Sequence, residues 1–260
     1  MKGLFLRIIA GICLLLWALD MVFPWRQVMS SEENPYHAIQ SRGKLIVGTI
    51  NNPISYFINA EGQSGLEYEL SKAFADYLNV ELEIKPLNNS EELFTALNVH
   101  DIDIAAANLF YQPNKIEHFQ LGPSYYSASW QIAYRKGENR PRSLAQINSQ
   151  LVIPDNAELE HILKEAKLKN PHLTWTVDKK QTQEELLLQV ADGKIDYTIA
   201  NSLDISAAQH IKPQIAVAFD LTDEMSVHWY LANNASNELQ SALLDFMNRS
   251  IDSGLIAKIE

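Results

Sequence analysis

The sequence predicts an α/β protein of two similar lobes, with a hinge that the chain crosses twice. Apolar runs of strand length alternate with segments whose apolar residues recur at helical spacing, as in folds that pack helices on a sheet. One helix-and-strand unit also occurs twice, once in each half of the chain. In addition, residues 127–134 alternate as a strand suited to carry the chain between lobes. A chain of 260 residues can supply two lobes of roughly 100 residues each.

The repeated unit is the strongest of these signals. Residues 91–108, EELFTALNVHDIDIAAAN, and residues 184–201, EELLLQVADGKIDYTIAN, agree at seven of eighteen positions without a gap. Each begins as an amphipathic helix, with Ser90 as the expected N-cap of the first, and ends as a short apolar strand that stops at an asparagine. One interpretation is that helix–turn–strand units of α/β proteins have similar sequences because their core positions are always apolar. The alternative is two lobes of like architecture, and it makes Asn108 and Asn201 cleft residues, since ligands bind at the carboxyl ends of parallel strands.

The first lobe is expected to comprise residues 43–126 and 222–260. Its opening elements are a strand at 44–50, a loop at 51–64, a helix at 66–78 and a strand at 80–85, followed by the first copy of the repeat. This order predicts parallel strands. Residues 109–126 have no sustained period. Glu67 and Glu69 are expected on the solvated face of the first helix, where negative charge suits the helix dipole.

The second lobe is expected to comprise residues 127–221 and to repeat the α/β alternation. Its elements are a strand at 151–153, a helix at 157–167, a strand at 173–177 and the second copy of the repeat. Strands expected at 215–220 and 227–232 return the chain to the first lobe. Amphipathic helices at 239–251 and 254–259 complete that lobe.

Residues 1–30 have the pattern of an export segment. Lys2 and Arg7 precede twelve apolar residues at 8–19, which is the length of a signal-peptide core and too short for an unaided membrane span. A cleaved signal peptide and an uncleaved anchor both remain open. Residues 31–42 are polar and are expected to form a linker.

Composition argues against several classes of function. The formal net charge of −11 disfavours binding to nucleic acids and to anionic lipid. The single cysteine, Cys13, lies in the export segment, so the remaining chain has neither a disulfide nor a thiolate metal site. The seven histidines are scattered and form no HExxH pattern. We therefore expect no metal and no cofactor.

Several segments resemble the family 3 periplasmic solute-binding proteins. They include GKLIVGT at 43–49, GLEYELSKAFADYL at 65–78 and ALLDFMNRSIDSGLIAKIE at 242–260. The resemblance covers residues 43–260. It implies a type II periplasmic-binding-protein fold, in which a small ligand binds between two lobes.

Three further segments more closely resemble the non-catalytic module of membrane-bound lytic murein transglycosylases. They are YYSASWQIAYRKGENRPRSL at 125–144, KIDYTIANSLDIS at 194–206 and AVAFDLTDE at 216–224. This resemblance implies a location in the periplasm, peripherally on the outer membrane. It also implies that peptidoglycan is reached through a C-terminal, lysozyme-like domain. Nothing in 1–260 resembles the catalytic Glu-Ser motif of that domain, so no residue here is expected to be catalytic. A stand-alone amino-acid-binding protein of an ABC transporter is the alternative.

The family resemblance also suggests ligand contacts. In relatives that bind amino acids, an arginine holds the ligand carboxylate and an acidic residue holds its ammonium; the matching positions are Lys115 and Asn201. Lysine keeps the charge but loses the bidentate fork, and asparagine has no charge. A buried ammonium without its counter-ion costs about 3–5 kcal/mol. Unless Asp204 or an acid from the loop 51–65 supplies that counter-ion, the sequence therefore favours a ligand that has a carboxylate but no free ammonium, such as a cell-wall peptide end.

Each candidate residue also has a structural interpretation. Tyr56 and Tyr111 can stack on a ligand or pack in the core. Asn108 and Asn201 can bind a ligand or cap strand ends. Lys115 can be a solvated loop lysine. The sequence does not decide between these readings.

Overall fold

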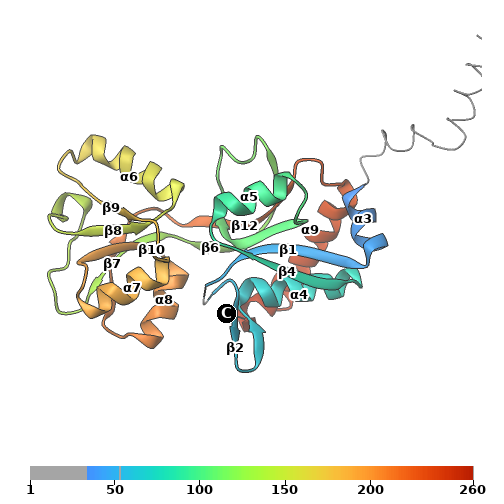
Figure 1. Cartoon of the computed structure of the whole chain (residues 1–260), viewed down its shortest axis with the longest axis horizontal. Coiled ribbons are helices and arrows are strands. Elements are labelled where there is room, and N and C mark those ends of the chain that lie inside the picture. Colours follow the sequence, from blue (N-terminus) through green and yellow to red (C-terminus); the bar gives the residue numbers. More distant parts are fainter. Residues whose placement is uncertain (1–33, 53, 260) are drawn as a thin grey trace, which may run out of the picture.

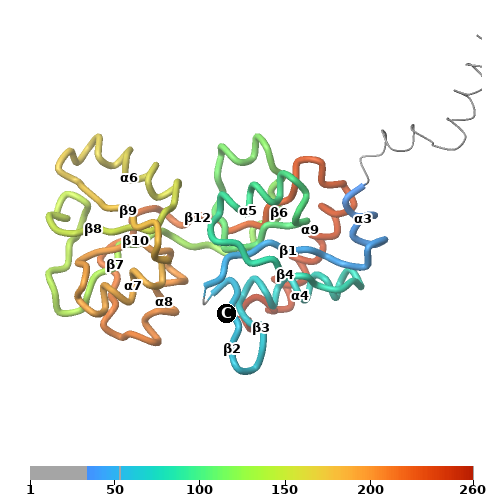
Figure 2. The backbone as a smooth tube through the Cα atoms, in the orientation of Figure 1, coloured from blue at the N-terminus to red at the C-terminus, as the bar shows by residue number. Residues whose placement is uncertain are grey.

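The computed structural model describes residues 34–52 and 54–259. Two five-stranded sheets, each with its own helices, lie side by side and are joined by two extended segments (Figures 1 and 2). The expected export segment, residues 1–30, lies outside the described residues. Within them, no helix is both long and apolar enough to cross a membrane.

The first lobe is built on a mixed sheet. Its strands, in spatial order, are β4 (Glu81–Leu87), β1 (Lys44–Ile50), β5 (Ile104–Phe110), β12 (Met225–Ala232) and β6 (Phe119–Ala128). Strand β1 runs parallel to β4 and β5, as the order of elements predicted, whereas β12 is antiparallel to β5 and β6. All seven residues of β5 are buried, as is typical of a central strand covered on both faces.

Five helices and a small hairpin complete the first lobe. They are α3 (Pro35–Arg42), α4 (Leu66–Leu78), α5 (Ser90–Asn98), α9 (Asn237–Asp252), α10 (Leu255–Ile259) and the hairpin of β2 (Phe57–Asn59) with β3 (Gly62–Ser64). Helix α4 has the predicted bounds because its apolar residues form one buried stripe, which includes Leu70, Phe74 and Leu78.

The second lobe has a similar plan. Its strands, in spatial order, are β11 (Ile215–Asp220), β7 (Trp130–Arg135), β10 (Tyr197–Asn201), β8 (Leu151–Pro154) and β9 (Thr176–Asp178). Its helices are α6 (Ala157–Lys169), α7 (Gln183–Asp192), α8 (Ser202–Ile211) and the short 3-10 helix η1 (Leu144–Gln146). Strand β10 is parallel to β8, and β8 is parallel to β9.

The chain passes between the lobes at two adjacent places. One passage is Ser129, between β6 and β7, and the other is the segment 221–224, between β11 and β12. The second passage is hydrogen-bonded to the residue that directly follows the first, since the N–H groups of Leu221 and Thr222 both donate to the carbonyl of Trp130, at 2.7 and 3.3 Å. The Trp130 N–H donates in return to the Thr222 hydroxyl at 3.1 Å. The twice-crossed hinge is therefore a paired two-strand connection.

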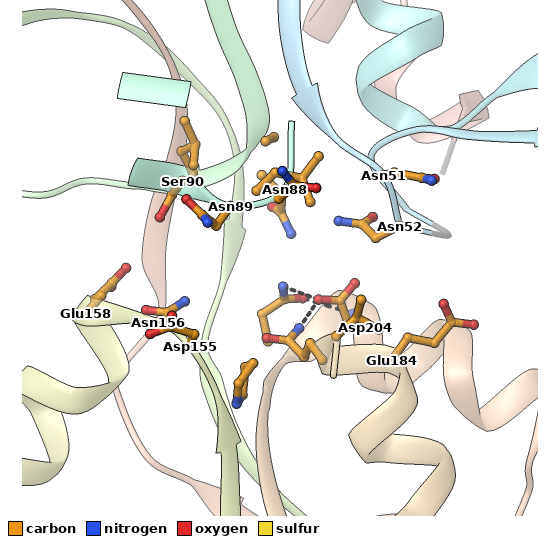
Figure 3. Close-up of a pocket in the computed structure, with 18 of the residues that line it drawn as sticks. Asn51, Asn52, Asn88, Asn89, Ser90, Asp155, Asn156, Glu158, Glu184 and Asp204 are labelled. Atoms are coloured by element: carbon orange, nitrogen blue, oxygen red, sulfur yellow. Dashed lines mark hydrogen bonds between the residues drawn. The ribbon is translucent and has the colours of Figure 1, made fainter. Parts of the chain in front are cut away.

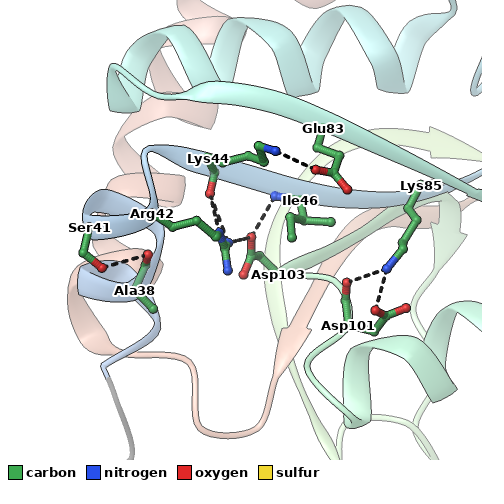
Figure 4. Close-up of polar contacts among 9 residues, drawn as sticks. All are labelled: Ala38, Ser41, Arg42, Lys44, Ile46, Glu83, Lys85, Asp101 and Asp103. Carbon is green, nitrogen blue, oxygen red and sulfur yellow. Dashed lines mark hydrogen bonds and ion pairs between the residues drawn. The ribbon is translucent and has the colours of Figure 1, made fainter.

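The internal repeat corresponds to a repeat of structure. The triplets β4-β1-β5 and β9-β8-β10 have the same order and are parallel. Asp103 accepts a hydrogen bond from the Ile46 N–H at 2.7 Å (Figure 4), and Asp196, 93 residues later, accepts one from the Gln150 N–H at 3.0 Å. Equivalent aspartates of the two repeats thus accept equivalent backbone hydrogen bonds. This favours two lobes of like architecture over chance similarity of the two sequences.

Several elements differ from the expectations. Residues 35–42 form helix α3 rather than a linker: Asn34 caps it, Pro35 begins it, and its Ile39 is fully buried. The cap of α5 is Asn89, not Ser90. Strand β6 includes the second part of the stretch expected to be irregular, residues 119–126, and the expected strand at 127–134 is broken at Ser129. Strand β11 stays in the second lobe, paired with β7, so only β12 returns.

Candidate functional site

A cleft of about 570 Å³ lies between the lobes. It is bounded by the carboxyl ends of β1, β5, β8 and β10 and the amino ends of helices α5 to α8. Its volume lies in the range typical of small-molecule sites. This is the position at which open parallel sheets bind ligands, and both lobes contribute to it.

Four helices begin at the cleft. Their N-cap residues, which all line it, are Asn89, Asn156, Thr182 and Asn201. Each side chain accepts a hydrogen bond from the backbone N–H three residues later, at 2.9 to 3.2 Å. Helix amino ends carry partial positive charge, so the surroundings of the cleft favour an anionic group.

The first-lobe wall consists mainly of neutral amides, which Figure 3 shows opposite the second-lobe residues. Its asparagines are Asn51, Asn52, Asn88, Asn89 and Asn108. Its acidic member, Glu92, is already engaged, because one carboxylate oxygen accepts from both the backbone and the side-chain nitrogen of Asn88, at 3.1 and 2.8 Å. This wall therefore offers hydrogen bonds of both polarities and little free charge.

The second-lobe wall carries most of the charge. Its ionisable residues are Asp155, Glu158, Lys179, Lys180, Glu184 and Asp204. A ligand with both a carboxylate and an ammonium group would find an opposite charge for each on this wall.

Asp204 is held in place by the end of β10. The Asn201 side chain accepts from the Asp204 N–H at 2.9 Å and donates to the Asp204 carboxylate at 2.5 Å. Gln183 donates to the same oxygen. The pKa of Asp204 is raised from 3.8 to about 7; burial is the main cause and the negative charge of Glu184 adds to it, while the hydrogen bond from Asn201 opposes the shift. Asp204 is thus poised to ionise fully when a cation arrives.

Glu158 connects the two lobes. It accepts from the Trp130 ring nitrogen at 3.2 Å and from the side-chain nitrogen of Gln112, which belongs to the first lobe, also at 3.2 Å. Burial raises the pKa of Glu158, and the two hydrogen bonds partly offset that shift. The Gln112–Glu158 bond is a contact that lobe motion must make or break.

The side chain of Asn108 makes no hydrogen bond, unlike that of Asn201, the equivalent residue of the second repeat. It lines the cleft, is 9% exposed and has a left-handed backbone, with φ of 54°. Its side-chain oxygen and nitrogen are both buried, and neither has a hydrogen-bond partner. An unpaired buried amide is costly, so a ligand that pairs it gains affinity.

The structure brings three of the six sequence-predicted residues into the cleft, namely Asn108, Asn201 and Asp204. The others lie outside its lining. The Lys115 ammonium pairs with the Glu91 carboxylate at 3.1 Å and lies 4.3 Å from the centre of the Phe94 ring.

The two tyrosines are also placed elsewhere. The ring of Tyr56 is buried, and its hydroxyl accepts from Gln63 at 2.9 Å. Tyr111 is 42% exposed. Ligand contact by Lys115, Tyr56 or Tyr111 stays a prediction.

Sequence reasoning missed several lining residues. Asp155 and Asn156 directly follow strand β8, so the rule that selected Asn108 and Asn201 was sufficient to find them, and Glu158 lies in the first turn of the helix that comes next. Glu67 was wrongly assigned to the solvated face: it is fully buried beneath Asn108 and receives three hydrogen bonds. Their donors lie on distant strands, which the sequence around Glu67 does not reveal.

Comparison with known proteins fits this geometry. The family model of the bacterial extracellular solute-binding proteins, family 3, matches residues 45–260. The chain belongs to this family. Solved structures support the family 3 fold. An amino acid ABC transporter substrate-binding protein of Streptococcus pneumoniae, bound to L-arginine, has a TM-score of 0.74 at 21% identity, over 86% of this chain and 95% of that one. An ancestral arginine-binding protein bound to arginine has a TM-score of 0.73 at 20% identity, over 84% and 96%.

Curated relatives in this family are much more similar in sequence. Two proteins named membrane-bound lytic murein transglycosylase F, from Mannheimia succiniciproducens and Pasteurella multocida, are 66% and 67% identical over the whole chain. The chain spans about half of their length, 54% and 53%. The resemblance to this group of solute-binding modules, and the type II periplasmic-binding-protein fold, are thus confirmed.

Proposed function

We propose that the chain binds a small carboxylate-bearing ligand, a cell-wall peptide or an amino acid, between its lobes. The observation that carries this proposal is the cleft itself, to which both lobes contribute carboxyl ends of strands and amino ends of helices. The helix ends, with Lys179 and Lys180, favour a carboxylate. Asp204 supplies a counter-ion for an ammonium, so ligands that carry one are included.

Binding is expected to close the lobes. The first-lobe amides and the second-lobe charges lie on opposite walls, so a ligand that contacts both favours the closed form. We propose that this closure regulates a lytic transglycosylase domain of the kind for which the curated relatives are named. The full-chain identity of 66% to one of them supports this role.

We also propose that the protein works in the periplasm, peripherally on the outer membrane. The family is described as extracellular and the relatives as membrane-bound, which supports this location. Membrane fractionation with an antibody to the chain tests it. Recovery in the cytosolic fraction would contradict it.

Calorimetry tests the ligand. The probes are the murein tripeptide L-alanyl-γ-D-glutamyl-meso-diaminopimelate and free L-arginine. We expect micromolar or tighter binding of the tripeptide and weaker binding of the amino acid. Failure of both probes counts against the proposed ligand class. Nanomolar binding of L-arginine alone favours the transporter alternative, which the arginine-bound structural neighbours also support.

A second assay tests regulation. Murein sacculi are incubated with the M. succiniciproducens relative, and release of soluble fragments is measured with and without the tripeptide. The proposal predicts a change in rate of threefold or more. An unchanged rate at saturating tripeptide would contradict the regulatory role.

A further inference from the structure

Glu67 is a buried acid without a cationic partner among the described residues. It lies in the first turn of α4 and is fully buried. Three donors from three strands converge on its carboxylate: the Asn108 N–H on β5 at 2.6 Å, the Trp229 ring nitrogen on β12 at 2.7 Å, and the Tyr125 hydroxyl on β6. Burial raises the pKa of Glu67, and these hydrogen bonds oppose the shift. A buried carboxylate is costly, so its retention needs an explanation.

The bond to Asn108 supplies one. A left-handed backbone costs most residues other than glycine roughly 1–2 kcal/mol, and asparagine is one of the few that adopt it more readily. Asn108 has this conformation inside strand β5, in a bulge where residues 106–108 lie opposite the single residue Trp229 of β12. The short bond from its N–H to Glu67 fixes the backbone there. The side chain at the cleft then has no hydrogen-bond partner of its own.

We propose that Glu67 is a positioning residue, whose carboxylate holds Asn108 in the left-handed conformation that presents its unpaired amide to a ligand. The inference rests on the proposed function, since it assumes a ligand in the cleft. The same carboxylate ties Asn108 to β6 and β12, the two strands that continue into the interlobe passages. Glu67 therefore connects Asn108 at the cleft with both strands that lead to the hinge.

A merely structural role makes a different prediction. If Glu67 only anchors the start of α4, its replacement lowers stability and leaves ligand affinity unchanged. A positioning role couples Glu67 to Asn108, so the two replacements are not additive. Leu70→Val is the matched control, because Leu70 lies one turn further along the same helix, is fully buried and has an apolar side chain.

The variants are E67Q, N108G, the double variant and L70V. In E67Q the new amide nitrogen faces one of the donors, so the N–H of Asn108 or the ring of Trp229 loses its acceptor. If E67Q does not fold, E67D replaces it, since aspartate is one carbon shorter and cannot reach all three donors. The full chain is titrated with the murein tripeptide, and the exchange rate of the Asn108 amide proton is measured by NMR without ligand.

We expect E67Q and N108G each to weaken tripeptide binding tenfold or more, and the double variant to bind no more weakly than N108G. We expect faster exchange of the Asn108 amide in E67Q, while L70V binds within twofold of wild type. Additive losses, or binding by E67Q within twofold of wild type, would overturn the proposal. If wild type does not bind the tripeptide, the proposed ligand fails and the exchange rate decides: an unchanged rate in E67Q would overturn the positioning role.

Discussion

Asn201 both caps helix α8 and orients its first acid, because its side chain accepts from the Asp204 N–H at 2.9 Å and donates to the Asp204 carboxylate at 2.5 Å. The residue at the end of β10 has no charge, yet it holds a charge at the cleft three residues later. The position of Asn201 has no acidic side chain, but Asp204 brings one to the cleft.

Asp204 should make stability depend on pH. Its pKa is about 7 in the folded protein against 3.8 for an ordinary aspartate. Below about pH 4 the Asp204 carboxyl is protonated in both the folded and the unfolded protein, and its contribution to the free energy of unfolding is complete. That contribution is lost as the pH rises to 7, because the unfolded protein releases the proton first. D204N keeps an oxygen for Asn201 and should exceed wild type by about 1–2 kcal/mol at pH 8, less than the full shift because the side chain is partly exposed.

Urea unfolding at pH 4 and pH 8 measures this difference. At pH 4 we expect D204N to be no more stable than wild type, because the wild-type carboxyl is then protonated. A wild type that exceeds D204N at pH 8 would contradict the burial of Asp204.

Asp204 should also govern ligand affinity. A ligand ammonium binds the ionised carboxylate, so affinity for L-arginine or the tripeptide should rise as the pH increases through 7. D204N should weaken binding about 10- to 100-fold at pH 8 and make affinity nearly independent of pH between 6 and 8. Calorimetry with the tripeptide and its N-acetylated form checks this. Equal losses for both forms would show that Asp204 does not bind the alanine ammonium of the tripeptide.

The hydrogen bond between Gln112 and Glu158 joins the two lobes, so it should favour a closed arrangement of the lobes over an open one. Q112A removes this bond and leaves the Glu158–Trp130 bond intact. A single hydrogen bond contributes about 0.5–1.5 kcal/mol, so the ratio of the two arrangements should change about two- to tenfold without ligand.

Single-molecule fluorescence transfer measures that ratio. Labels are attached at Val99 and Leu168, which are exposed and lie on different lobes, after replacement of Cys13 by serine. S41A, which removes a surface hydrogen bond within α3, is the control. An unchanged distribution in Q112A would show that the contact does not influence the hinge.

The repeated aspartates should stabilise their lobes unequally. Asp103 accepts from the Ile46 N–H and also pairs with Arg42, whereas Asp196 accepts from the Gln150 N–H. D103A should cost about 1–3 kcal/mol and D196A about 1 kcal/mol, because only the first also removes an ion pair, that with Arg42. Urea unfolding checks the order. A larger loss in D196A would contradict it.

The sequence predicted elements wherever local pattern and tertiary structure agree. Helix α4 has the expected bounds because one face is apolar and buried. Strand β6 was missed because Gly122 and Pro123 interrupt its period, although pairing with β12 holds it in the sheet. Helix α3 was missed despite Asn34 and Pro35, which are good signals for a helix start, because its composition is polar.

The residues of the candidate site were likewise predicted only in part. The offset of 93 residues found Asn108 and Asn201 because both lie near the carboxyl ends of repeated strands that line one cleft. The repeat did not show that they differ: Asn201 caps a following helix, whereas Asn108 lies inside β5 with a left-handed backbone. Glu67 was out of reach for a similar reason, since its three donors lie 41 to 162 residues away along the chain.

Hydrogen–deuterium exchange with and without the murein tripeptide tests the central claim most directly, which is that one ligand engages both lobes. The account predicts simultaneous protection of residues 107–110 in the first lobe and 201–204 in the second, with little change in the hairpin 57–64. Protection of one lobe alone, or of neither at saturating tripeptide, would contradict it.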